Sequence, residues 1–287
     1  MNNPNYKFLS VQGRTIPQTN DSIQYFPSNW KEEFPILTSL GFTGIEWIYD
    51  KESEQTNPIL TKMGRMNMLD FSKKYNVDLE NIVFDWFLVH PLLIHDEFSI
   101  EEKLEKLLFL LDVSRQSGFK HVIFPLMEKN SIDDDSKAEK FIKIIRDNVL
   151  EYLNKWGIEL HLETSLSPEK ECQILKKLDS KYVKICYDMG NSASYGFNSE
   201  TSIKTLSSYI GSVHVKDRKL HGPTMPLGRG DVNFYKVFES LSTIGFCGPI
   251  TFQVYRNKNS DNISILKESM RFINDIILNT TVNTNGN

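Results

Sequence analysis

The stretch from Ile158 to Asp217 contains three short apolar runs, and each run ends in a residue that can bind a metal. The runs are Ile158-Glu-Leu-His-Leu-Glu163, Val183-Lys-Ile-Cys-Tyr-Asp188 and Ile210-Gly-Ser-Val-His214. Each is rich in apolar and β-branched residues and is followed by turn residues, which is typical of a parallel strand buried on both faces. Because the carboxyl ends of such strands meet in one mouth, we expect the last residues of the three runs to lie together.

Strand-like and helix-like patterns alternate on both sides of this stretch, from about Phe8 to about Leu278. Besides the three runs, strands are predicted over Lys7–Gln12, Gly44–Tyr49, Asn81–Val89, His121–Met127 and Pro249–Tyr255. Helices are predicted over residues 29–40, 58–75, 99–118, 133–157, 168–178, 201–209, 234–244 and 260–278.

Eight strand and helix units of this kind predict an α/β protein with a closed (β/α)8 TIM barrel. The main competitor is a doubly wound open sheet, but the chain has no Gly-x-Gly-x-x-Gly after an early strand and no phosphate-binding loop motif. We expect a single barrel domain over residues 1–278 and a frayed polar tail over residues 279–287.

The net charge, the hydropathy and the cysteine content indicate which partners and which cellular compartment to expect. The chain has 287 residues and a formal net charge of -4, which gives it no general attraction to nucleic acid. No apolar run approaches the roughly 20 residues that a membrane span needs. Three scattered cysteines fit a reducing compartment. We therefore expect a cytoplasmic protein without nucleic-acid or membrane partners.

Glu163, Asp188 and His214 make a mixed oxygen and nitrogen ligand set. Such a set suits Mn²⁺, Mg²⁺, Co²⁺, Fe²⁺ or Zn²⁺ and leaves positions open for substrate oxygens. Each residue alone also has a structural interpretation: an ion pair for Glu163, a turn cap for Asp188 and a satisfied core histidine for His214. Their recurrence at equivalent ends of three successive strands favours a metal site.

Four motifs of the chain resemble those of the xylose isomerase-like TIM-barrel superfamily, the sugar phosphate isomerase/epimerase group. They are Glu163-Thr164, Tyr187-Asp-Met-Gly-Asn191, Val213-His-Val-Lys-Asp217 and Leu227-Gly-Arg-Gly-Asp-Val-Asn-Phe234. The resemblance covers nearly the whole chain. It implies a divalent metal held by Glu163, Asp188 and His214, with a fourth ligand from the eighth strand.

The fourth position implied by the resemblance is Gln253, where the family carries a glutamate. A glutamine oxygen can still ligate a metal, but it adds no charge and takes no proton at neutral pH. In the family's epimerases the two glutamates transfer protons on opposite faces of the substrate. Glu163 is then the one remaining carboxylate of the pair, unless Glu46, His90 or Lys216 replaces the other.

Other residues at predicted strand ends are further candidates. We expect Lys216 to act in catalysis beside Glu163, or to meet a substrate carboxylate or phosphate. Candidates for substrate binding are Glu46, Trp47, His90, Asn191 and Arg229.

The resemblance implies a metal-dependent isomerase or epimerase of a small sugar or sugar phosphate, working through a metal-stabilised enediolate. Two alternatives stay open: a dehydratase of an inosose-like or dehydroshikimate-like compound, and a barrel that binds a sugar without catalysis because of Gln253. An abasic-site endonuclease is the weakest alternative, since the chain lacks the histidines of a multi-metal cluster. Pairing into a homodimer is also expected from the resemblance.

Overall fold

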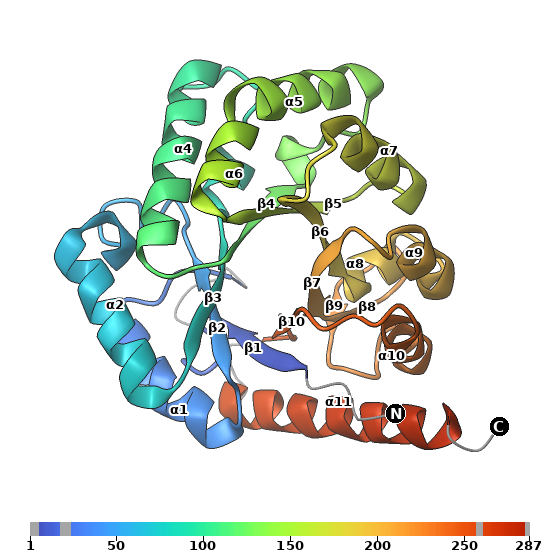
Figure 1. The fold of residues 1–287 in the computed structure, drawn as a ribbon. Helices are drawn as coiled ribbons and strands as arrows, with labels where there is room; N and C mark the ends of the chain where they lie inside the picture. Colours follow the sequence, from blue (N-terminus) through green and yellow to red (C-terminus); the bar gives the residue numbers. More distant parts are fainter. Residues whose placement is uncertain (1–5, 18–23, 257–260, 285–287) are drawn as a thin grey trace.

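A computed structural model of the chain, which describes residues 6–17, 24–256 and 261–284, contains a closed barrel of eight parallel strands (Figure 1). Neighbouring strands follow the order β1-β2-β3-β4-β5-β6-β7-β10, and β10 pairs with β1 to close the barrel. This confirms the predicted (β/α)8 TIM barrel. The strands are β1 Lys7–Val11, β2 Gly44–Ile48, β3 Asp78–Val83, β4 His121–Leu126, β5 Glu159–Thr164, β6 Val183–Asp188, β7 Ile210–Val215 and β10 Pro249–Phe252.

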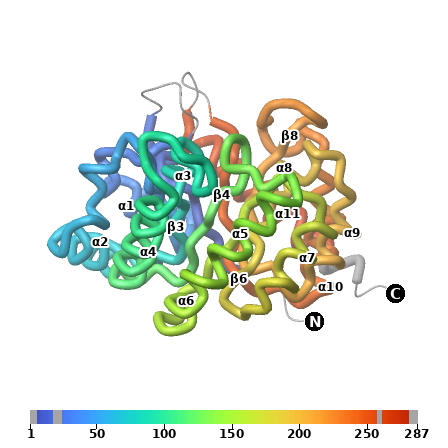
Figure 2. Tube along the Cα trace, turned by 90° about the horizontal axis from the view of Figure 1, so that it is seen from above, coloured from blue at the N-terminus to red at the C-terminus, as the bar shows by residue number. Residues whose placement is uncertain are grey.

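Helices surround the barrel in chain order (Figure 1). They are α1 Glu33–Leu40, α2 Lys62–Tyr75, α3 Trp86–Val89, α4 Ile100–Gln116, α5 Asp135–Asn148, α6 Leu150–Trp156, α7 Pro168–Leu178, α8 Met189–Ser194, α9 Ser199–Thr205, α10 Phe234–Thr243 and α11 Asn262–Thr284. Short 3-10 turns are η1 Trp30–Glu32, η2 Pro58–Leu60 and η3 Glu128–Asn130. A small hairpin, β8 Asp217–Arg218 and β9 Thr224–Met225, follows β7 and lies at the upper end of Figure 2 together with α3 and α8.

Besides small shifts of bounds and the unpredicted α8 and β8–β9 hairpin, three elements differ from the sequence prediction. The third strand ends at Val83 instead of Val89, and the apolar run continues into α3, where Trp86 and Phe87 pack as a helix. The helix predicted over residues 133–157 is two helices that meet at Val149. Helix α11 continues to Thr284, past the expected end at Leu278, while residues 285–287 of the expected tail lie outside the described residues.

Side chains of the strands alternate between the barrel interior and the surrounding helices, because successive residues of a strand point to opposite faces. Phe84, Phe124 and Phe238 belong to the large apolar core between strands and helices. A smaller separate cluster contains Ile48 and Val83 together with Val11, Ile123 and Cys186. Several residues two positions from this cluster on the same strands are polar, so the barrel interior also carries ionisable and hydrogen-bonding side chains: Glu46, Asn81, His121 and Asp188.

Among the described residues, we find no helix whose length and apolar character would let it cross a membrane.

Candidate metal centre and cavity

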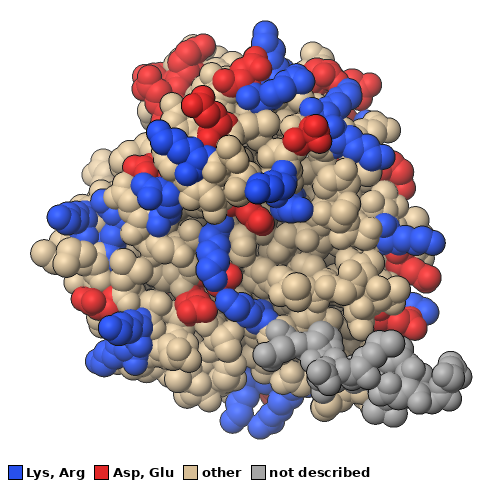
Figure 3. All heavy atoms as spheres, viewed as in Figure 1, with Lys and Arg blue, Asp and Glu red and all other residues tan. Residues whose placement is uncertain are grey.

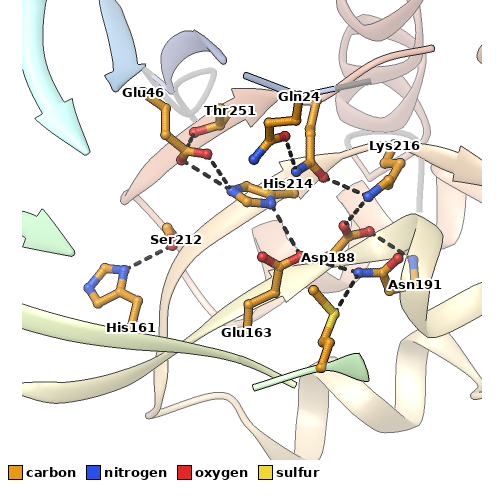
Figure 4. Close-up of polar contacts among 12 residues, drawn as sticks. Gln24, Glu46, His161, Glu163, Asp188, Asn191, Ser212, His214, Lys216 and Thr251 are labelled. Carbon is orange, nitrogen blue, oxygen red and sulfur yellow. Dashed lines mark hydrogen bonds and ion pairs between the residues drawn. The ribbon is translucent and has the colours of Figure 1, made fainter. Parts of the chain in front are cut away.

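The ends of β5, β6 and β7 bring Glu163, Asp188 and His214 together (Figure 4). Asp188 pairs in register with His214 across adjacent strands. One ligand atom from each of the three residues lies within 4.8 Å of the other two, and all three residues are buried. The strand pattern predicts this meeting, because three neighbouring parallel strands each place their last inward residue at the same end of the barrel.

Glu46 of β2 orients the His214 ring from behind (Figure 4). Its carboxylate lies 3.0 Å from His214 Nε2, and Glu46 also accepts hydrogen bonds from Asn81 Nδ2 and Thr251 Oγ1, both at 3.0 Å. His214 Nδ1 is buried, lies 3.7 Å from Glu163 Oε1 and has no hydrogen-bond partner among the described residues. An imidazole held by a carboxylate on one nitrogen, with the other nitrogen unpaired toward carboxylates, is the usual arrangement of a metal-binding histidine.

These residues fit a divalent cation. Burial alone would lower the pKa of His214, but Cys186, Glu46 and Glu163 raise this pKa well above its ordinary value. The ring therefore carries a proton that a bound cation would replace. A carboxylate from Glu163, a carboxylate from Asp188 and a nitrogen from His214 supply the donor atoms.

Lys216 contacts two of the predicted ligands. Its ammonium donates to Asp188 Oδ2 at 3.2 Å and to Gln253 Oε1 at 2.7 Å. Burial acts to raise the pKa of Asp188, but Lys216, His214 and the backbone amide of Asn191 together lower it below its ordinary value. Asp188 is therefore ionised and ready to accept either an ammonium or a metal ion.

Gln253 is held in one orientation by a chain of hydrogen bonds. Its carbonyl accepts from Lys216, and its amide Nε2 donates to Gln24 Oε1 at 2.8 Å. Gln24 Nε2 in turn donates to Asp85 Oδ2 at 2.7 Å. A glutamate at position 253 would lack the donor that Gln24 needs, so the glutamine is matched to its neighbours.

Asn191, a predicted substrate-binding residue, instead supports Glu163. Its Nδ2 donates to Glu163 Oε1 at 3.2 Å, while its Oδ1 accepts from Arg218 Nη1 at 2.9 Å. The backbone N–H of Asn191 also donates to Asp188 Oδ1 at 2.8 Å, where Asp188 caps α8. One residue thus positions both carboxylates of the candidate centre.

A cavity of about 210 Å³ opens beside this centre. It is lined by residues from the ends of several strands and from the loops that follow them: Arg14, Gln24, Asp85, Leu88, Pro125, Met127, Glu128, Glu163, Lys216, Thr224 and Gln253. Burial, and to a lesser degree the carboxylates of Glu163, Asp50 and Glu46, raise the pKa of Asp85 to about 7, although Gln24 acts to lower it. Asp85 was missed from sequence because the third strand was predicted to extend past it. With the strand ending at Val83, Asp85 becomes a strand-end residue.

Like Asn191, the other four candidates for substrate binding do not line this cavity. Glu46 has no exposed surface and holds His214 instead. Trp47 is fully buried against Trp30 and donates to Asn57 Oδ1 at 3.0 Å, because it points to the helix side of β2. The structure corrects both expectations: the alternation of β2 turns Trp47 outward, whereas Glu46 points into the barrel but is covered by His214, Asn81 and Thr251.

His90 and Arg229 also lie elsewhere. His90 packs on Trp86 with ring centroids 4.4 Å apart, and its Nδ1 lies 3.3 Å from Asp96 Oδ2. Arg229 is exposed on the loop after the β8–β9 hairpin, where it does not line the cavity. Neither side chain lines the cavity, because the His90 ring packs between Trp86 and Phe98 and Arg229 points to the surface.

Comparison with known proteins identifies relatives along most of the chain. The uncharacterized protein MJ1311 of Methanocaldococcus jannaschii is 30% identical over 142 residues, which is 44% of this chain and about half (47%) of that protein. L-ribulose-5-phosphate 3-epimerase UlaE of Shigella flexneri is 19% identical over 239 residues, covering 81% of this chain and 84% of the epimerase.

Solved structures share the fold. The structure of L-ribulose 3-epimerase superposes with a TM-score of 0.75 at 15% identity and covers 98% of this chain and 97% of its own. The IOLI protein, whose structure holds a zinc atom, has a TM-score of 0.69 at 14% identity, with 96% and 97% covered. A family model described as xylose isomerase-like TIM barrel matches residues 34–276. The chain therefore belongs to the xylose isomerase-like TIM-barrel family.

Proposed function

We propose that the chain is a divalent-cation-dependent isomerase or epimerase of a small sugar or sugar phosphate. The observation that carries the proposal is the meeting of Glu163, Asp188 and His214 beside a cavity, with the far nitrogen of His214 held by Glu46. Relatives that are sugar epimerases support the class of substrate and reaction.

Glu163 is the proposed general base. It lines the cavity, and Asn191 holds one of its oxygens in place. A divalent ion held by Glu163, Asp188, His214 and the neutral Gln253 would polarise the substrate carbonyl and make the neighbouring C–H more acidic. One carboxylate at hydrogen-bond distance from that C–H is then sufficient to remove the proton. Lys216, which lines the same cavity, would meet the developing negative charge or a phosphate.

Asp85 is the proposed second proton-transfer group. It lines the same cavity as Glu163, and a pKa near 7 allows it to hold or release a proton at neutral pH. Glu46 and His90, which the sequence offered as substitutes for the missing glutamate, are engaged by His214 and Asp96. A second group favours epimerisation, because inversion of a carbon needs a proton returned from the opposite face.

Deuterium exchange tests the proposal. Wild type, Glu163→Gln, Asp85→Asn and the cavity-rim control Glu128→Gln are incubated with L-ribulose 5-phosphate in D2O with Mg²⁺, Mn²⁺ or Zn²⁺. After the ion is removed with EDTA, ¹H NMR measures exchange beside the carbonyl and formation of the epimer.

We expect wild type and Glu128→Gln to exchange the proton and to form the epimer. Glu163→Gln should lose both by about a hundredfold or more, while Asp85→Asn should keep exchange and lose inversion. Full activity of Glu163→Gln would contradict the proposal. So would a wild type that neither exchanges nor converts this ketose phosphate, its unphosphorylated form or D-psicose.

One observation supports a second candidate, a barrel that binds a sugar without turnover. Lys216 places an ammonium against Asp188 and Gln253, where it competes with a metal ion. A thermal shift of the wild type with L-ribulose 5-phosphate, without exchange or product under any of the three ions, would favour this candidate.

A further inference from the structure

We propose that His121, Glu159 and His161 form a second divalent-cation site, at the amino-terminal end of the barrel, and that this site suits zinc. One ligand atom from each of the three residues lies within 4.8 Å of the other two. The site is separate from the cavity and does not depend on the proposed function, since His121 and Glu159 begin strands β4 and β5 while the cavity lies beyond the strand ends.

Strand register brings the three residues together. His121 and Glu159 are direct partners in the β4–β5 pairing, and His161 follows Glu159 by two residues on the same face of β5. The two imidazole rings lie 4.7 Å apart at an angle of 23°. His161 has no exposed side-chain surface, whereas the Glu159 side chain is 33% exposed, so water can reach the site from the barrel end.

Each imidazole is oriented through the nitrogen that would not bind the ion. His121 Nδ1 lies 2.9 Å from Asn81 Oδ1, and His161 Nδ1 lies 2.8 Å from Ser212 Oγ. Figure 4 shows the contact between His161 and Ser212. Hydrogen bonds of this kind fix the ring of a metal-binding histidine and leave Nε2 as the donor atom.

Glu159 is placed beside these donor atoms. Its Oε2 lies 2.9 Å from His161 Nε2, close to the spacing of about 3.3 Å that two ligands have in a tetrahedral zinc shell with bonds of about 2 Å. A nitrogen of His121 completes the set within 4.8 Å. Gly211 of β7 leaves the space for the His161 ring, because a Cβ there would lie 2.5 Å from Nε2.

The ligand atoms of this site differ from those of the candidate metal centre at the other end of the barrel. Two imidazoles and one carboxylate, with water in the fourth position, match the ligands of many zinc sites. The candidate metal centre at the carboxyl ends of the strands has oxygen ligands from Glu163, Asp188 and Gln253 and a single imidazole, and this combination suits harder cations. A zinc ion between His121 of β4 and the two ligands of β5 would join these strands at their starting ends.

The test counts zinc ions per chain. Full-length wild type, His121→Ala, Glu159→Gln, His214→Ala and the exposed control His95→Ala are stripped with EDTA and dialysed against buffered free Zn²⁺. Elemental analysis then gives the zinc content, and thermal unfolding with and without Zn²⁺ gives a second measurement. Glu159→Gln keeps the shape of the side chain, so it tests the site even where His121→Ala does not fold.

We expect two zinc ions per chain in wild type and in His95→Ala, and one in each of the other variants. In the His214→Ala background, Zn²⁺ should raise the unfolding temperature, and adding Glu159→Gln should remove that increase. A wild type with a single zinc, lost in His214→Ala, would overturn the proposal. Two ions retained in both His121→Ala and Glu159→Gln would overturn it as well.

Discussion

Lys216 lies where it can affect both metal and substrate binding at the candidate metal centre. Its ammonium contacts Asp188 and Gln253, and these two residues are also predicted metal ligands. Without a bound cation, the lysine neutralises Asp188 and fixes the glutamine carbonyl. When a cation binds, the lysine must release both oxygens, and its charge becomes available to an anionic substrate. Under the proposed function, the same side chain would therefore oppose metal binding and support substrate binding.

Replacement of Lys216 separates these two effects. Lys216→Met removes a positive charge beside the ligands, so we expect metal affinity to increase by roughly tenfold or more. Isothermal titration of the EDTA-stripped protein with Mn²⁺ measures the affinity. The exposed Lys129→Met is the control and should not change it. Weaker metal binding in Lys216→Met would show that the lysine supports the ligands instead of competing.

Metal affinity should also depend on pH through His214. Glu46, Glu163 and Cys186 raise the pKa of this imidazole well above its ordinary value despite burial, so a cation must displace a proton to bind. Below that pKa, affinity should increase with rising pH, by up to about tenfold per pH unit for one proton released.

Titrations in buffers of different ionisation enthalpy measure the proton released from His214. Glu46→Gln removes one of the carboxylates that hold the proton, so it should weaken the dependence on pH. An affinity that stays constant from pH 5.5 to pH 8 would contradict the assignment of His214 as a ligand.

The sequence predicts a site residue well when the residue lies at the end of a regular strand and faces the barrel interior. It predicts a site residue poorly when the residue lies in a loop. Glu163, Asp188 and His214 follow from the pattern, because they end three buried runs whose direction and register are fixed by the barrel. Trp47 does not, since the residue next to an inward Glu46 must point outward. Asp85 lies in a loop whose course depends on contacts distant in sequence, such as the one with Gln24.

At the scale of elements, local signals predict where helices begin and end. Ser99 and Glu102 form a capping box at the start of α4, and Gly41 and Gly157 end α1 and α6 in the left-handed conformation. The β8–β9 hairpin has no such signal. It is held by Asp217, whose carboxylate accepts from the backbone amides of Gly228, Gly230 and Val232.

Helix α7 contains a buried acid that weakens the fold at neutral pH. Burial raises the pKa of Glu171 to about 8, although Thr164 Oγ1 donates to it at 2.8 Å. Between pH 4.5 and 8 the folded chain binds a proton that the unfolded chain has released, so stability falls as pH rises through this range.

Glu171→Gln should remove that loss. We expect the free energy of unfolding at pH 7 to increase by on the order of 2 kcal/mol, with no gain at pH 4.5. Urea unfolding at the two pH values measures the change. Glu169→Gln, at an exposed position of the same helix, is the control. An equal gain at both pH values would mean that the effect comes from packing and not from the proton.

At the scale of the whole molecule, the outer face shown in Figure 3 differs from the barrel interior in the arrangement of its ionisable groups. Acidic and basic side chains intermix on the face shown in Figure 3, in line with the small net charge of -4. The barrel interior, in contrast, holds Glu46, Asn81, His121 and His161 in hydrogen-bonded contacts. Stability of the whole barrel therefore depends on the protonation of interior groups.

Acid should unfold the barrel through its interior histidines. Burial, with a smaller contribution from His161, lowers the pKa of His121 to about 4, and burial also lowers the pKa of His161. Below the ordinary pKa of 6.5 the unfolded chain binds protons that the folded chain excludes, so stability falls from pH 6.5 toward pH 4.

His121→Gln should reduce this slope in chemical unfolding measured with EDTA present. His95→Gln, at an exposed position, should leave it unchanged. A slope that is the same in wild type and His121→Gln would show that other groups control acid unfolding.

The segment from Asp217 to Val232 has a consequence for how this protein can diversify. Both ends of the segment are joined through the single side chain of Asp217, which binds three backbone amides near the far end. Thr224 of the segment lines the cavity, and Arg218 contacts Asn191. Insertions or exchanges between these fixed ends would alter the cavity while leaving the eight barrel strands untouched. Sequence changes in this segment would therefore be a route by which related proteins change their substrate specificity without changing the barrel.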